Sequence, residues 1–77
     1  MSAGFHIPLS VVPAGRTVVL RRVRDGHGLT SRLAAMGLVP GVAIAVHQNH
    51  RGGPLVVGVK EGRLMLGRGM AEKMAVE

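Results

Sequence analysis

Cysteine is absent from the 77-residue sequence, and Phe5 is its single aromatic residue. The lack of cysteine excludes disulfides and thiolate-bound metals, and it is typical of proteins that work in a reducing compartment. Long apolar segments are also missing, because the longest apolar run, at residues 42–46, falls far short of the roughly 20 residues that span a bilayer. The N-terminus does not have the pattern of a secretory signal. We therefore expect a soluble, cytoplasmic protein.

Acidic residues are scarce: four Asp and Glu face ten Lys and Arg, which gives a net charge of +6. No closely spaced pair of carboxylates is available for acid–base catalysis, and there is no cysteine nucleophile. None of the serines lies in a Gly-x-Ser-x-Gly context, and the glycine-rich stretches lack the spacing of a phosphate loop. We therefore expect a protein that is not an enzyme and that carries no cofactor. The excess of positive charge instead indicates an acidic partner.

Aliphatic residues are abundant, in short stretches that alternate with polar residues or are rich in β-branched side chains. Such stretches, separated by glycine and proline, predict strands. The strands are expected at residues 16–24, 42–49, 54–60, 64–67 and 74–76, after an extended arm at 6–15. The apolar spacing between Leu20 and Val23 predicts a bulge near Arg21 and Arg22. These elements favour a mainly β fold, a small five- to six-stranded antiparallel barrel with one short α-helix, because closure removes exposed strand edges.

The stretch RLAAMGLVPG, residues 32–41, predicts a short helix that ends abruptly. Gly37 suits the left-handed position after a helix, which places Leu33 and Leu38 in the hydrophobic contact of a Schellman motif. Pro40 prevents the helix from continuing, and Thr30 is the candidate N-cap. The residues assigned to this structural turn are Gly37, Pro40 and Gly41.

Positive charge is densest at Arg21, Arg22, Arg24 and Arg32. Both a solvated face and a docking patch for an acidic surface fit this cluster. Nucleic acid is a further acidic partner for a basic chain. With one aromatic residue, however, the chain lacks the platforms on which unpaired bases stack, and we expect no nucleic-acid partner.

Histidine provides the one plausible set of metal ligands. His47 and His50 flank a predicted hairpin turn and are candidates for binding ferrous iron. Two histidines without a nearby carboxylate make a poor site for iron or zinc. We assign no metal ligand in this sequence.

The order of several short motifs is similar to that of the FeoA family, the ferrous iron transport protein A of bacteria. The family pattern is Arg-Leu, a Gly-Leu-x-Pro-Gly element, a hairpin whose second strand opens with proline, a Leu-Gly/Arg-rich segment and Ala-x-x-hydrophobic-x-Val. The matching positions are Arg32, Leu33, Met36, Gly37, Leu38, Pro40, Gly41, Gly53, Pro54, Leu66, Arg68, Ala71, Met74 and Val76. The resemblance covers residues 9–76 of a single domain expected at 1–77. Because the chain lacks a helix-turn-helix module, it is similar to the freestanding form of the family.

This resemblance implies a Src-homology-3-like barrel, in agreement with the strand pattern. It further implies a small cytoplasmic accessory protein that binds the cytoplasmic G-protein region of FeoB, the membrane transporter of ferrous iron, and modulates transport. The family implies no catalytic or metal site of its own. Through its partner, the protein would lie at the periphery of the inner membrane.

We assign partner binding to Arg32, Met36 and Leu38, on the helix and its terminating turn. Arg22 and Arg24 would add charges that speed association more than they raise affinity. Two alternatives remain open at this point. One is a basic small-barrel nucleic-acid-binding protein, and the other is a direct carrier of ferrous iron through His47 and His50.

Overall fold

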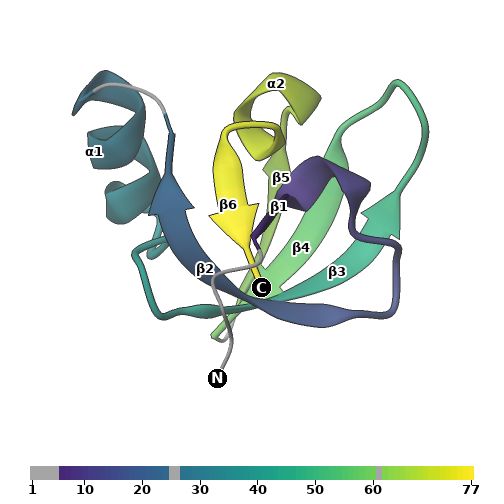
Figure 1. Ribbon diagram of the computed structural model, residues 1–77. Helices are drawn as coiled ribbons and strands as arrows, with labels where there is room; N and C mark the ends of the chain where they lie inside the picture. The colour runs from purple at the N-terminus through teal and green to yellow at the C-terminus, as the bar shows by residue number, and fades with distance from the viewer. Residues whose placement is uncertain (1–5, 25–26, 61) are drawn as a thin grey trace.

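The computed structural model describes residues 6–24, 27–60 and 62–77. Six strands form one antiparallel sheet in the order β1-β6-β2-β3-β4-β5, and the sheet is strongly curved (Figure 1). The elements in chain order are β1 (Ile7–Pro8), the 3-10 helix η1 (Leu9–Val11), β2 (Thr17–Val23), α1 (His27–Ala35), β3 (Ala43–Asn49), β4 (Leu55–Val59), β5 (Gly62–Leu66), α2 (Arg68–Ala71) and β6 (Met74–Val76). The predicted class, mainly β and antiparallel with one short helix, is confirmed. Helix α2 adds a single turn. The predicted closure is not observed, because β1 and β5 remain as the edges of the sheet, but the curvature of the sheet gives a barrel-like fold.

The core is aliphatic throughout, as the composition requires. Alternation within the strands places every second side chain inside, as with Ile44 and Val46 in β3. Its largest fully buried members are Leu9, Leu20, Leu33, Leu38, Ile44, Leu55, Leu66 and Met74, joined by Val12, Val46, Val57 and Val76. These side chains come from η1, α1, the strands and, for Val12 and Leu38, the segments that follow η1 and α1, so both of these helices are held by apolar packing.

Strand β2 serves both halves of the sheet. Its first part pairs with β3, where Thr17 opposes Ala45, and its second part pairs with β6, where Val23 opposes Met74. The register shifts between Leu20 and Arg22, which confirms the bulge predicted from the apolar spacing. Such a bulge bends a strand and increases its twist, and here it lies where β2 changes partner.

Helix α1 ends in the predicted Schellman motif. Gly37 has a φ of +85°, the N–H of Leu38 donates to the carbonyl of Leu33 at 2.9 Å, and the N–H of Gly37 donates to the carbonyl of Ala34 at 2.9 Å. The N-cap prediction was wrong, because the helix begins at His27 and Thr30 lies inside it. The physical reason is tertiary: Leu29 packs against the core, so the preceding turn is helical despite its glycine.

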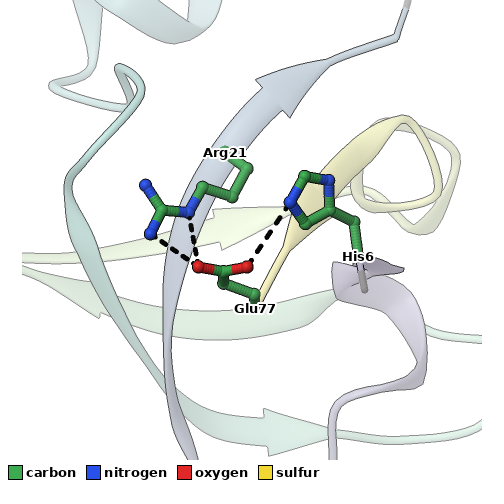
Figure 2. Close-up of polar contacts among 3 residues, drawn as sticks. All are labelled: His6, Arg21 and Glu77. Carbon is green, nitrogen blue, oxygen red and sulfur yellow. Dashed lines mark hydrogen bonds and ion pairs between the residues drawn. The ribbon is translucent and has the colours of Figure 1, made fainter. Parts of the chain in front are cut away.

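The C-terminal end of the described chain is fastened to β2. The backbone of Glu77 exchanges two hydrogen bonds with Val19, of 2.8 and 3.0 Å. Its side-chain carboxylate lies between Arg21 and His6, with Oε2 accepting from Nε and Nη2 of Arg21 and Oε1 lying 3.4 Å from Nε2 of His6 (Figure 2). Arg21 is therefore occupied within the fold.

Candidate partner-docking site

A groove lies between α1 and α2, two helices at the same end of the curved sheet (Figure 1). Its volume is about 310 Å³. The residues that line it are Gly28, Leu29 and Arg32 from α1, Gly69 and Met70 from α2, and Lys73 just beyond α2. The groove therefore depends on two short elements that the core brings together from distant parts of the sequence.

The groove combines an apolar floor with positive charge. Leu29 and Met70 are half-buried and pack against the core, so their remaining exposed surface faces the groove. Arg32 is exposed in the last turn of α1, and Lys73 is exposed on the other side. None of the six lining residues carries a carboxylate. This arrangement suits an acidic segment that inserts an apolar side chain between the helices.

Two of the predicted charges, Arg32 and Arg24, lie at this groove. Arg32 lines it directly, and the N–H of Arg24 donates to the carbonyl of Lys73 at 2.7 Å, which places Arg24 beside its rim. Arg22 is exposed on β2. Arg21 is held by Glu77 as described above. The bulge in β2 thus lies within the dense basic stretch, and one of its arginines is engaged in an internal ion pair.

The structure corrects the assignment of Leu38 to the partner surface. Leu38 is 1% exposed, because the hydrogen bonds of the Schellman motif turn its side chain onto the core beside Leu33. Its role is structural. Met36 is 37% exposed and Val39 is 41% exposed, so these two side chains are the accessible apolar groups of the turn. Met36 remains available to a partner, although it does not line the groove.

The predicted turn residues orient the connection from α1 to β3. Gly41 has a φ of +98°, which favours glycine, and its N–H donates to the carbonyl of Leu20 at 2.7 Å. The N–H of Leu20 donates in turn to the carbonyl of Val42 at 2.9 Å. With Pro40 in the turn and Gly37 at the helix end, this ladder ties the helix terminus to β2.

Four lining residues were not expected from the sequence as part of a site: Gly28, Leu29, Gly69 and Lys73. Met70 was not assigned to a site either. The apolar periodicity of α1 indicates that Leu29 faces the core, but nothing in the sequence indicates that Leu29 lies opposite Met70. That relationship arises from the packing of both residues on one core.

Arg68, which matches the family pattern, is a hub of hydrogen bonds. Its guanidinium donates to the carbonyls of Gly53, Ser10 and His50 at 3.1, 3.2 and 2.7 Å, and to Oδ1 of Asn49 at 2.6 Å. Asn49 also donates to the carbonyls of Ser10 and Val12, at 3.0 and 2.7 Å. These bonds join η1, the β3–β4 hairpin and α2, so Arg68 is a structural residue.

The histidine pair lies at the far end of β3. His47 and His50 are exposed. Across residues 6–24, 27–60 and 62–77, no three His, Cys, Asp or Glu side chains come close enough together to hold a metal ion. Over the same residues, no helix has the length and apolar character needed to cross a membrane.

Comparison with known proteins places this fold among iron-transport proteins. The FeoA domain family matches residues 7–77. A protein of Methanocaldococcus jannaschii, described as a candidate Fe(2+) transport protein A, is 33% identical over 70 residues, which cover 91% of this chain and 84% of that protein.

Two solved structures extend the comparison. A crystal structure of an iron uptake regulatory protein, FeoA, has a TM-score of 0.89 and 32% identity, covering 95% of this chain and 97% of that one. The zinc complex of Stenotrophomonas maltophilia FeoA, described as a procaryotic SH3 domain protein, has a TM-score of 0.79 and 28% identity, covering 92% and 89%. The predicted Src-homology-3-like fold is thereby confirmed. With a family match over residues 7–77 and a relative at 33% identity, the chain belongs to the FeoA domain family of ferrous iron transport accessory proteins.

Proposed function

We propose that this protein is a cytoplasmic accessory protein of ferrous iron uptake that binds the cytoplasmic G-protein region of an FeoB-type transporter and modulates transport. The observation that carries the proposal is the groove between α1 and α2, where Leu29 and Met70 form an apolar floor beside Arg32 and Lys73. Association with the transporter would bring the protein to the inner membrane.

The proposed contacts fall into two classes. Leu29 and Met70 would receive an apolar side chain of the partner, which is the kind of buried central contact that contributes most to affinity. Arg32 at the groove, with Arg24 beside it and Arg22 exposed on β2, would attract acidic residues and accelerate encounter. Met36 would contact the partner at the edge of this surface, since it is 37% exposed at the end of α1.

The test is a titration of the fluorescently labelled cytoplasmic domain of the transporter with this protein, with and without a guanine nucleotide. The wild type should bind, and Arg32→Glu should weaken binding by about tenfold, because it replaces attraction with repulsion at the groove. Arg51→Glu is the matched control. It reverses an exposed charge in the β3–β4 hairpin, outside the groove, and should change affinity little.

A second variant tests the shape of the groove. A Cβ at Gly69 would meet no other atom within 4 Å, so Gly69→Leu should fold while occupying the groove. We expect it to abolish binding with an unchanged circular dichroism spectrum. Lack of binding by the wild type would contradict the proposed partner. Equal affinities for the wild type, Arg32→Glu and Gly69→Leu would instead contradict the proposed surface.

A further inference from the structure

A second groove crosses the outer face of the sheet over β2, β3, β4 and β5, with a volume of about 420 Å³. Because Ile44 and Val46 point into the core, the alternate residues Ala43 and Ala45 face outward and form part of its floor. Gly58 and Gly62 continue the floor on β4 and β5. The groove shares no lining residue with the groove between α1 and α2.

The imidazole of His47 lies across Gly58. An ideal Cβ built at Gly58 would be 2.5 Å from Nε2 of His47, a separation that real side chains do not adopt. Because Gly58 has no side chain, the imidazole ring of His47 can pack directly against β4. Arg63 is the register partner of Gly58 on the opposite side, in β5. His47 and Arg63 thus flank Gly58, and both line the groove.

Lys60 supplies a second cation from an unfavourable backbone position. Val59 pairs with Gly62, so Lys60 begins a two-residue hairpin connection, and its φ is +55°. Among the residues that the structure describes, it is the one non-glycine residue with a positive φ. Turns of this kind favour Gly, Asn or Asp, and a lysine there costs on the order of 1 kcal/mol. Lys60 therefore lies at the groove although its positive φ is unfavourable for lysine.

We propose that this groove binds a phosphate group. A phosphate monoester carries a charge of about −1.5 to −2 at neutral pH, which the cations of Lys60 and Arg63 match. The guanidinium of Arg63 offers paired donors to phosphate oxygens, and His47 offers a ring nitrogen. Among the residues 6–24, 27–60 and 62–77, no carboxylate lines the groove to compete for these donors. The small floor residues leave room for the rest of a phosphorylated molecule.

The same chemistry occurs in free phosphate compounds and in lipid headgroups, and two titrations distinguish them. The first follows amide shifts of the ¹⁵N-labelled protein as inorganic phosphate is added at constant ionic strength. The second measures cosedimentation with vesicles of phosphatidic acid, whose headgroup is a phosphate monoester, and phosphatidylcholine, against phosphatidylcholine alone. We expect saturable shifts at Gly58, Gly62 and Arg63 for a soluble ligand. Vesicle binding without those shifts would assign the site to a lipid headgroup.

Lys60→Asn is the decisive variant, because asparagine tolerates a positive φ and carries no charge. Its thermal midpoint should equal or exceed that of the wild type, while its affinity in whichever titration is positive should fall by about tenfold, the effect of losing one charge-assisted hydrogen bond. Arg51→Gln removes the same charge at the other end of β4 and should leave affinity unchanged. Equal losses in both variants would show unspecific attraction and overturn the proposal, as would two negative titrations. Both readouts are independent of the transporter, so they do not depend on the proposed function.

Discussion

Arg21 and Glu77 form a two-pronged contact: Nε and Nη2 of the arginine lie 2.9 and 2.6 Å from the same carboxylate oxygen. The two residues are 56 positions apart in the sequence, and the contact fastens the end of the sheet to β2 (Figure 2). Because of this contact, Arg21 has a different role from the arginines next to it. Arg22 and Arg24 remain exposed for a partner, whereas Arg21 is engaged with an acid of its own chain.

Replacing Glu77 should weaken the fold only slightly. The side chains of Arg21 and Glu77 are 44% and 27% exposed, and ion pairs at such positions contribute about 0.2 to 1 kcal/mol. We expect Glu77→Gln to lower the free energy of unfolding in urea by that amount at low ionic strength. The difference from wild type should shrink in 1 M salt, because salt screens the pair. Glu72→Gln, at an exposed carboxylate, is the control for the change in net charge and should have no comparable effect.

Gly37→Ala should destabilise the protein through its backbone alone. A Cβ at Gly37 would touch nothing within 4 Å, but the φ of +85° is unfavourable for alanine by about 1 to 2 kcal/mol. Urea unfolding should show a loss of that size. Gly69→Ala is the matched control, since its Cβ would also be free and its φ is not positive. It should leave stability unchanged or raise it. Equal losses at both positions would contradict the Schellman assignment.

Substitution by alanine should reduce stability much more at Leu38 than at Met36, although the two residues are close in sequence. Leu38→Ala opens a cavity in the core and should lower the free energy of unfolding by about 2 to 5 kcal/mol. Met36→Ala, at a side chain that is 37% exposed, should cost about 0.5 kcal/mol or less. Urea unfolding of both variants measures the difference. A large loss at Met36 with none at Leu38 would show that the turn packs differently.

Arg68→Lys should damage the structure even though it keeps the charge. A lysine ammonium cannot reach all four acceptors that the planar guanidinium of Arg68 contacts. Because hydrogen bonds to charged groups contribute about 1.5 to 3 kcal/mol each, we expect a loss of about 2 kcal/mol or more. Hydrogen exchange should accelerate at Gly53, whose N–H donates to the carbonyl of His50 in the hairpin. Arg51→Lys, in the same hairpin, should change neither quantity.

Much of this fold can be predicted from the sequence because its determinants are local. Alternating aliphatic residues mark β3 and β4, and Gly37 marks the helix end, where the backbone chemistry of one residue decides the outcome. The bulge in β2 is likewise visible as a spacing of three between apolar residues. A second register shift in β3, between Val46 and Gln48, leaves no such signal and was not predicted.

The candidate docking site is harder to predict from the sequence than the fold, because its residues are far apart in the sequence. Leu29 and Met70 meet only after α1 and α2 pack on one core. Leu38 was placed on the surface because the helix is short, yet the Schellman contact that the sequence itself indicates requires Leu38 to pack against Leu33. Exposure of an apolar residue after a helix is therefore better judged from the terminating motif than from helix length.

The strand order has a consequence for how the protein is made. Strand β6, the last in the chain, lies between β1 and β2, the first two. The ribosome must therefore synthesise residues 74–76 before the N-terminal strands can join one sheet. Until then β2 lacks its partner beyond the bulge, and the nascent chain has an unpaired strand edge at Arg22 and Val23. The sheet can therefore be completed only after residues 74–76 have been synthesised, through contacts between segments that are distant in the sequence.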